Sequence, residues 1–369
     1  MHATSTEARL ELLEADGAFA GLESWLRKKG FFEPGGERLA ADLYLGYGLS
    51  QSLRRTATPT LPEPCPELPL LACSVRPGDY PVGHYDNRSD RNGMVGGRRL
   101  VWEPSWSAAN YRQAVEKVRA AIRRGDVYQV NLVQHLSAPF RGDAYSLASA
   151  LRRFEPRVSE PFVGDDWAIV SASPELFLAR RGRRVWTMPI KGTRPAGRGD
   201  ELRRSAKDAA EHVMIVDLER NDLARVCEPG SIRWPELMVT RLLAGVEHMV
   251  STVEGTLREG VGIAQLLEAA FPGGSVTGAP KIAAVDLIAE LEQVGRGASM
   301  GALGSVYGNG DLDLALTIRT FAIAGGRIHF WVGGGIVWDS DAAAEVEESW
   351  TKARPLLWAI ETAGGAETG

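Results

Sequence analysis

The stretch Asp126-Val-Tyr-Gln-Val-Asn-Leu-Val-Gln-His-Leu136 reads as a β-strand that follows a periodic helical segment at 107–125. A period of two residues puts the amides Gln129 and Asn131 on one face of this strand. The opposite face would hold Tyr128, Val130 and Leu132. Two amides on an otherwise apolar strand could lie on an exposed edge or in a binding site, and the residues leave both readings open.

Outside this stretch, helix and strand patterns follow one another irregularly. The patterns predict a hairpin over 167–188 with its turn at 181–183, a helix over 200–222, a Gly- and Pro-rich loop at 272–280 that opens a helix, a strand over 313–323 and a final helix over 341–361. In the strand at 313–323, Thr317, Arg319 and Phe321 share one side. A regular alternation of strand and helix would indicate a parallel sheet, whereas this irregular mixture indicates an α+β fold.

Length and charge limit the class of protein. The 369 residues, 44% of them hydrophobic, can bury the core of one large domain or two smaller ones. The formal net charge of −5 argues against a nucleic acid or an anionic membrane as a partner. No apolar run approaches the ~18 residues that span a bilayer, and the opening residues do not resemble a signal peptide.

The cysteines indicate a reducing compartment. Cys65, Cys73 and Cys227 are odd in number and do not have the close spacing of a cysteine metal site. We therefore expect no disulfide framework and a cytoplasmic location.

A Pro-rich segment divides the chain. Residues 56–81 hold seven of the 20 prolines. Because proline lacks an N–H donor, this segment is expected to be an extended connection rather than a helix or a central strand. The sequence therefore predicts an N-terminal region at 1–100 and a main domain at 101–369.

Two carboxylate pairs repeat one spacing on two predicted helices. Asp208 and Glu211 are three residues apart, as are Glu345 and Glu348, so each pair shares a helix face. Surface helices carry many such pairs, and each pair alone fits that reading. Brought together, the pairs would offer the hard oxygen ligands of Mg²⁺, with room for water and an anionic substrate. None of the six histidines has the spacing of a softer metal site.

Two turns could also carry chemistry. The loop Phe271-Pro-Gly-Gly-Ser-Val-Thr-Gly-Ala-Pro-Lys281 lacks the contiguous Gly-Lys-Ser/Thr of a P-loop, so it could hold an anion through backbone N–H groups or serve as a structural turn. Lys191 leaves a strand into a glycine-flanked turn. Most such lysines are solvated, but desolvation would lower the pKa of the amine and make it a nucleophile. The residues thus permit a Mg²⁺-dependent enzyme that acts on an anionic small molecule.

These segments resemble those of the chorismate-utilising enzymes. That family includes anthranilate synthase large subunits, isochorismate and salicylate synthases, and component I of aminodeoxychorismate synthases. The similar stretches, in family order, are Gly125-Asp-Val-Tyr-Gln-Val-Asn131, Ser173-Pro-Glu175, Pro189-Ile-Lys-Gly-Thr-Arg194, Ser205-Ala-Lys-Asp-Ala-Ala-Glu-His212, Ile215-Val-Asp-Leu-Glu-Arg-Asn-Asp222, residues 271–281, Thr317-Ile-Arg319 and Gly333-Gly-Gly-Ile-Val-Trp-Asp339. The resemblance implies a fold like that of anthranilate synthase component I, with large β-sheets and helices around a central chorismate site.

Two positions separate the branches of that family. Aminodeoxychorismate synthases share the Pro-Ile-Lys-Gly-Thr of residues 189–193, whereas anthranilate synthases have alanine in place of the lysine. Isochorismate and salicylate synthases carry a lysine base at the position of Gln129. The resemblance therefore implies the aminodeoxychorismate synthase branch, which makes 4-amino-4-deoxychorismate for para-aminobenzoate and folate synthesis.

The resemblance also implies catalytic roles. Lys191 would attack ring C2 of chorismate while Glu175 protonates the departing C4 hydroxyl, and His248 would lie near that hydroxyl. Ammonia would then attack C4 and expel the lysine.

For the cofactor, the resemblance implies Mg²⁺ held by Glu211 and Glu348, with Asp208 and Glu345 holding its waters. The residues that it implies for substrate binding are Thr193, Thr277, Gly278, Tyr307, Arg319, Gly333, Gly334, Gly335 and Lys352.

The ammonia is expected from a partner. None of the three cysteines lies in the glycine-flanked turn of a glutaminase nucleophile, so a separate glutamine amidotransferase subunit is expected. Two alternatives remain. The first is an ortho-aminating relative of anthranilate synthase, which Lys191 disfavours. The second is a catalytically silent regulatory relative, which the intact set of site residues disfavours.

Overall fold

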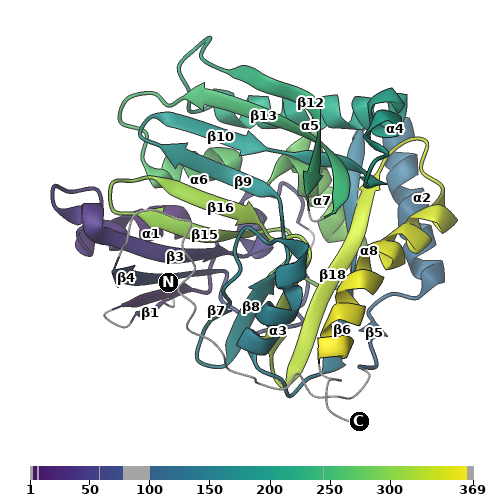
Figure 1. Ribbon diagram of the computed structural model, residues 1–369, viewed down its shortest axis with the longest axis horizontal. Coiled ribbons are helices and arrows are strands. Elements are labelled where there is room, and N and C mark those ends of the chain that lie inside the picture. The colour runs from purple at the N-terminus through teal and green to yellow at the C-terminus, as the bar shows by residue number, and fades with distance from the viewer. Residues whose placement is uncertain (1–2, 6–7, 58, 78–99, 244, 364–369) are drawn as a thin grey trace.

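Two antiparallel sheets form the framework of the protein (Figure 1). The computed structural model describes residues 3–5, 8–57, 59–77, 100–243 and 245–363. The 11-stranded sheet has the spatial order β1 (Ala3–Ser5), β2 (Arg9–Leu12), β4 (Leu71–Pro77), β3 (Leu39–Leu45), β15 (Ala302–Tyr307), β16 (Leu312–Leu316), β9 (Leu176–Arg181), β10 (Arg184–Met188), β13 (Val246–Thr256) and β11 (Ile190–Pro195), with β12 (Arg233–Leu243) also paired to β13. The seven-stranded sheet has the order β14 (Gly278–Ala279), β6 (Gln129–Pro139), β18 (Arg327–Ile336), β17 (Thr320–Ala324), β8 (Trp167–Ser171) and β7 (Phe162–Val163), with β5 (Glu103–Pro104) also paired to β6.

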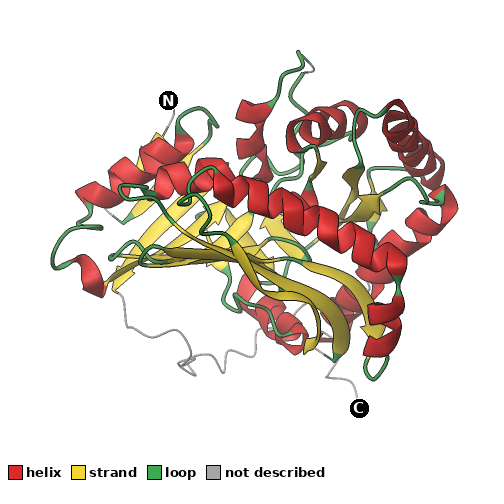
Figure 2. Cartoon of the chain, turned by 90° about the horizontal axis from the view of Figure 1, so that it is seen from above, coloured by secondary structure: helices red, strands yellow, loops and turns green. Residues whose placement is uncertain are grey.

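Helices cover the outside of the two sheets, as Figure 2 shows. They are α1 (Ala18–Lys28), α2 (Ala108–Arg124), α3 (Ala144–Leu151), α4 (Gly199–Arg204), α5 (Ala206–Ala224), α6 (Ile263–Ala270), α7 (Lys281–Leu291) and α8 (Ala342–Ala363). One hydrophobic core joins both sheets, and a second core seats α3 and α8 on the seven-stranded sheet around the stacked rings of Phe321 and Phe330. The predicted α+β class is therefore confirmed. No described helix is long and apolar enough to cross a membrane.

The helix predicted over 107–125 is confirmed as α2. The Ser107 side chain accepts a hydrogen bond from the backbone N–H of Asn110, which satisfies one free donor of the first turn. Gly125 ends the helix at φ 82°, a conformation that costs glycine little. Local chemistry is sufficient to determine both ends of this helix.

The strand that follows lies inside the sheet. Strand β6 pairs along its length with β18, and its other edge pairs with β14 and β5. Gln129 and Asn131 are both buried, so the exposed-edge reading is wrong. Tyr128 precedes the strand and is 66% exposed, so its predicted place on the apolar face is also wrong. The alternation of apolar and polar residues in the sequence includes Tyr128, but the strand that pairs in the sheet begins one residue later, at Gln129.

Three predicted segments have different boundaries. The hairpin comprises only β9 and β10, while β8 joins the other sheet. The single strand predicted over 313–323 is two strands, β16 and β17, in different sheets. Arg319 lies between these strands at φ 50°. The helix predicted over 200–222 is broken into α4 and α5 at Ser205, whose side chain caps α5. Periodicity describes each segment locally and does not show where the chain changes sheet or direction.

The Pro-rich segment contains a central strand, which contradicts the expected extended connection. Strand β4 lies between β2 and β3, and its only proline, Pro77, is its last residue. The residues before Pro77 therefore keep the N–H donors that the sheet needs. Strand β3 in turn pairs with β15, so residues before and after the predicted boundary at residue 100 share one sheet.

A buried histidine pair joins β6 to β18. The ring nitrogens His135 Nε2 and His329 Nδ1 lie 3.0 Å apart, and both side chains are buried. Burial lowers the pKa of His135 from 6.5 to about 3, and the charges of His329 and Arg327 act in the same direction. The folded protein therefore holds His135 neutral at pH values where the unfolded chain protonates it.

We predict that this histidine makes the protein lose stability as the pH falls below 6.5. Because the folded pKa is the lower one, its contribution is fully present above the unfolded value and is lost as the pH falls towards the folded value, by at most about 1.4 kcal/mol per pH unit. Denaturant unfolding of the wild type and of His135→Asn between pH 7 and 5 measures this. The variant should show the shallower decline, and equal slopes would contradict the prediction.

Candidate active site

Lys191 lies in β11, at the edge of the larger sheet. The strand pairs with β13, and the register shifts between Lys191 and Thr193, where Gly192 has φ 70°. Such a bulge changes the direction of neighbouring side chains. Burial lowers the pKa of the Lys191 amine, and the acidic side chains of Glu175 and Glu211 oppose this only in part.

Glu175 lies just before β9 and is 5% exposed. Its carboxyl accepts hydrogen bonds from the Ser275 hydroxyl at 2.9 Å and from the Ile190 backbone N–H at 3.5 Å. Burial raises the pKa of Glu175, although Ser275, Lys191 and Arg319 all act to lower it. Burial thus favours the uncharged forms of both Glu175 and Lys191, because each charged form loses water.

His248 and Arg319 lie close to this pair. His248 Nδ1 lies 3.3 Å from the Thr193 hydroxyl and 3.4 Å from the Gly192 carbonyl oxygen. Burial lowers the pKa of His248, and the charge of Arg319 lowers it further. The three predicted residues Thr193, His248 and Arg319 are thus brought together around Lys191 and Glu175.

The two carboxylate pairs meet across α5 and α8. Lys207 lies 4.0 Å from Glu211 on α5, and its charge also lowers the pKa values of Glu345 and Glu348 on α8. Burial raises the pKa of Glu211 and of Glu345. Burial acts in the same direction on Glu348, but the ammonium of Lys352 at 2.7 Å outweighs it and lowers that pKa.

These carboxylates suit a Mg²⁺ ion that keeps water and substrate ligands better than a metal ion enclosed by protein ligands alone. Among the described residues, no group of three or more acidic, histidine or cysteine side chains is arranged to hold a metal alone. Mg²⁺ typically takes one or two protein carboxylates and fills its remaining positions with water and substrate oxygens. Glu211 on α5 and Glu348 on α8, with an anionic substrate between them, would meet that requirement. Asp208 accepts a hydrogen bond from Arg194 at 2.8 Å, and Glu345 accepts one from Ser340 at 2.7 Å.

Three consecutive glycines of β18 let polar side chains approach the backbone. Lys352 donates to the Gly333 carbonyl at 3.1 Å. A Cβ on Gly334 would lie 3.2 Å from the Lys352 ammonium nitrogen, and a Cβ on Gly335 would lie 2.1 Å from the Gln129 side-chain nitrogen. Larger residues here would displace both polar groups. The predicted residues Gly333, Gly334, Gly335 and Lys352 therefore form one surface beside the carboxylates.

The loop at 272–280 pairs with the start of β6. Gly278 has φ 148°, and a Cβ there would lie 2.1 Å from the Gln129 carbonyl oxygen. The buried Thr277 hydroxyl donates within the loop, to the Gly273 carbonyl at 2.8 Å. Gln129 is fully buried, and neither its side-chain oxygen nor its nitrogen has a partner among the described residues. Such an amide requires a partner, which a polar ligand could provide.

Tyr307 does not lie with these residues. The backbone N–H of Leu316 donates to the Glu175 carbonyl oxygen, so Leu316 lies beside the site. Ala302, the first residue of β15, pairs with Leu316, so β15 begins beside the site as well. Tyr307 ends β15 five residues later, about 16 Å away along the strand. Its ring contacts Arg181 at the far end of β9. The structure therefore does not bring Tyr307 together with the other predicted substrate-binding residues.

Sequence reasoning missed four residues around the site: Arg194, His212, Ser275 and Glu219. His212 Nε2 lies 2.6 Å from the Ser251 hydroxyl, while its Nδ1 has no partner in the described part of the chain. His212 and Glu219 follow Asp208 and Glu211 at helical spacing along α5, and that periodicity could have identified both. Nothing in the sequence pattern points to Arg194 or Ser275 as partners of Asp208 and Glu175.

A profile of the chorismate binding enzymes matches residues 84–358. The chain belongs to this family. Among curated proteins, aminodeoxychorismate synthase component 1 of Klebsiella aerogenes is 42% identical over 271 residues, which is 71% of this chain and 60% of that protein. Anthranilate synthase component 1 of Thermus thermophilus is also 42% identical, over 73% of this chain and 61% of that protein. The chain thus matches about 60% of the length of these relatives.

Solved structures of chorismate binding enzymes share the fold. Anthranilate synthase component I of Streptococcus pneumoniae superposes with a TM-score of 0.75 at 28% identity, over 86% of this chain and 80% of that one. A putative 2,3-dihydroxybenzoate-specific isochorismate synthase of Bacillus anthracis gives 0.72 at 20% identity, over 97% of this chain and 92% of that one. The predicted fold, two large sheets with helices as in anthranilate synthase component I, is confirmed. Both aminating branches are similar to this chain, so the likeness alone does not separate them.

We predict that Glu211 and Glu348 are required for Mg²⁺ binding, whereas Glu345 is a positioning residue. Glu211→Gln and Glu348→Gln should abolish Mg²⁺-dependent turnover of chorismate, while Glu345→Gln should weaken Mg²⁺ affinity by roughly 10–100-fold. Calorimetric titration of Mg²⁺ in the presence of chorismate measures the affinities. Glu347→Gln, on the exposed face of α8, is the matched control. Full activity in excess EDTA would contradict a metal requirement.

Proposed function

We propose that this chain is an aminodeoxychorismate synthase component I, which converts chorismate and ammonia to 4-amino-4-deoxychorismate. The observation that carries the proposal is the half-buried Lys191 beside the buried Glu175, whose charges act on each other. Burial lowers the pKa of the amine and raises that of the carboxyl. A neutral amine is a nucleophile and a neutral carboxyl is an acid, which are the two groups that the first displacement needs.

In the first step, the Lys191 amine forms a bond to ring C2 with its electron pair. Both ring double bonds shift along the conjugated path from C2 to C4, and the C4–O bond breaks. Hydroxide is a poor leaving group, so Glu175 gives its proton to the departing oxygen and water leaves. The Ser275 hydroxyl, which donates to the Glu175 carboxyl, keeps that carboxyl in place and stabilises the carboxylate that forms.

Other side chains hold the substrate. Arg319 and Lys352 are the cations that would bind its carboxylates, and the buried Gln129 amide gains a polar partner when the site is filled. His248 would contact the C4 hydroxyl. Mg²⁺ held by Glu211 and Glu348, with Asp208 and Glu345 on its waters, would supply polarisation of the ring carboxylate.

A partner would supply ammonia. The names of the similar proteins, component 1, point to assembly with a second component, and we propose a glutamine amidotransferase in that role. All three cysteines are free and buried, which supports a reducing, cytoplasmic location and gives none of them the exposure of a glutaminase nucleophile.

The covalent step gives a direct test of Lys191. Wild-type protein mixed with chorismate and Mg²⁺ without ammonia should gain the mass of chorismate less one water, because release of the adduct needs ammonia or the slower return of water. Intact mass spectrometry with peptide mapping should place the addition on Lys191. Lys191→Ala should lose both the adduct and rapid para-amination, whereas the exposed Lys117→Ala should retain both.

Rapid para-amination by Lys191→Ala, with no adduct on the wild type, would contradict the covalent route. An ortho-amino product would instead favour the anthranilate branch, and no amino product would favour a silent relative.

The source of nitrogen gives a second test. Ammonium salt should support turnover by the isolated chain, whereas glutamine should do so only after a glutamine amidotransferase is added. Product analysis by liquid chromatography, with each nitrogen donor alone, measures this. Glutamine-dependent turnover by the chain alone would contradict the proposed partner.

A further inference from the structure

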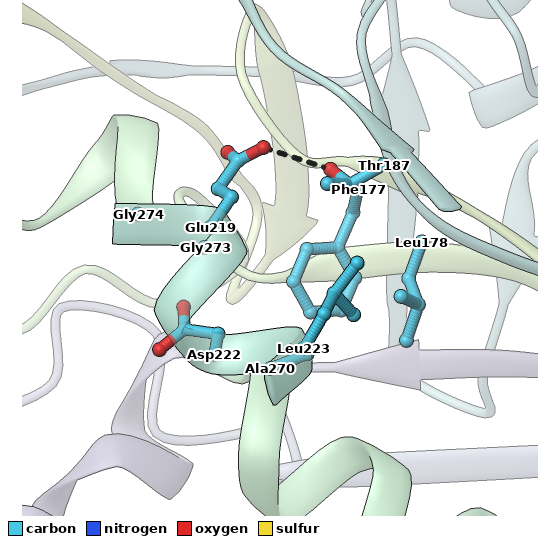
Figure 3. Close-up of a pocket in the computed structure, with 9 residues that line it drawn as sticks. All are labelled: Phe177, Leu178, Thr187, Glu219, Asp222, Leu223, Ala270, Gly273 and Gly274. Atoms are coloured by element: carbon cyan, nitrogen blue, oxygen red, sulfur yellow. Dashed lines mark hydrogen bonds between the residues drawn. The ribbon is translucent and has the colours of Figure 1, made fainter. Parts of the chain in front are cut away.

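A small cavity lies between α5, α6 and the strands β9 and β10 (Figure 3). Its accessible volume is about 10 Å³, close to the minimum that holds one water-sized molecule. Apolar walls come from Phe177, Leu178, Leu223 and Ala270, and Gly273 and Gly274 close one side. Two carboxyls of α5, Glu219 and Asp222, also line it.

The two carboxyls are in different states. Asp222 accepts a hydrogen bond from the Lys281 ammonium at 2.5 Å, so its charge is balanced. Glu219 is 7% exposed and accepts a hydrogen bond from the Thr187 hydroxyl at 3.1 Å, which Figure 3 shows. Within the described chain, no cation forms an ion pair with Glu219, and no second hydrogen bond reaches its other oxygen. A buried carboxylate without a cation is costly, so this position can accept a cation or a proton.

The cavity adjoins the catalytic pair. Residues 273–275 separate the two, because Gly273 and Gly274 line the cavity while Ser275 donates to the Glu175 carboxyl. A Cβ on Gly274 would lie 3.3 Å from the Glu219 Cγ, so glycine leaves room for this side chain. Burial raises the pKa of Glu219 well above its usual range, and the nearby charge of Glu175 raises it further. The charge of Glu219 also acts to raise the pKa of the Lys191 amine.

We propose that Glu219 and this cavity form an ammonium site, in which the Glu219 carboxylate holds the cation and accepts one of its protons. This inference rests on the proposed function. It identifies the step in which ammonium loses a proton and becomes the ammonia that reacts. An ammonium ion has about the size of this cavity. Its positive charge would balance the carboxylate of Glu219, which has no cation partner among the described residues. A divalent metal would need more oxygen ligands than this apolar cavity offers.

The proton balance is closed. Ammonium gives one proton to the Glu219 carboxylate, which leaves ammonia with a free electron pair. That pair forms the bond to C4 while both ring double bonds shift back and the C2–N bond to the protonated Lys191 adduct breaks. The electrons of the broken bond return to the lysine nitrogen as a neutral amine, and the product carries the new ammonium group. The proton on Glu219 then returns to solvent before the next ammonium binds.

Steady-state kinetics with ammonium chloride as the nitrogen source test this site. Glu219→Gln keeps the size of the side chain and removes its charge. It should raise the KM for ammonium at least 10-fold, with the KM for chorismate unchanged and the rate of Lys191 adduct formation changed by a much smaller factor. Thr187→Val removes the hydroxyl that orients the carboxyl and should raise the ammonium KM by a smaller factor. Asp217→Asn is the matched control, because Asp217 lies on the exposed side of the same helix and should leave all three quantities unchanged.

The outcomes are separable. Adduct formation near the wild-type rate shows that each variant is folded with an intact catalytic pair. An unchanged ammonium KM in both Glu219→Gln and Thr187→Val would overturn the ammonium site, as would an equal slowing of adduct formation, which would make Glu219 part of the first displacement. Potassium chloride should compete with ammonium in the wild type if the site is a cation site, and lack of competition would overturn it. Because either amino product reports on the ammonium KM, an ortho-amino product would overturn the proposed function without affecting this inference, whereas no amination by the wild type would overturn both.

Discussion

The desolvation of Lys191 and Glu175 is the constraint on which the site depends. In water, an amine of ordinary pKa is protonated and a carboxyl is ionised, so the two would form an ion pair with neither nucleophile nor acid. Burial lowers the pKa of the Lys191 amine and raises that of the Glu175 carboxyl, so it disfavours the charged form of each group. The sheet edge at β11, the loop at 273–275 and helix α5 together enclose the pair.

Close backbone approach is the second requirement, and glycine makes it possible. Lys352 of α8 can contact the backbone of β18 because Gly333, Gly334 and Gly335 carry no side chain. The loop before α7 can pair with the start of β6 because Gly278 leaves space for the Gln129 carbonyl. These contacts bring polar groups of three separate elements close together, and one of these groups, the buried Gln129 amide, has no partner among the described residues.

Helix α5 links two parts of the chemistry. Its N-terminal half presents Asp208 and Glu211 to α8, and its C-terminal half presents Glu219 and Asp222 to the small cavity. The same helical periodicity therefore serves the proposed metal site and the proposed ammonium site. The apolar residues between them, Ile215 and Val216, are buried and keep the two acidic regions apart.

The sequence alone determined the local elements and the chemical character of the site. Ser107 and Gly125 delimit α2, the spacing of Asp208, Glu211, Glu345 and Glu348 assigns them to shared helix faces, and the motif around Lys191 identifies the family. Only the tertiary structure decided that Gln129 is buried without a partner, that residues 313–323 divide between two sheets at Arg319, and that Tyr307 lies at the far end of β15. The pairing of Glu175 with Ser275, and the burial of Glu219 with only the Thr187 hydroxyl as its hydrogen-bond partner among the described residues, were also decided there. The reason is physical: periodicity and capping act over a few residues, whereas strand pairing, burial and desolvation depend on segments a hundred or more residues apart.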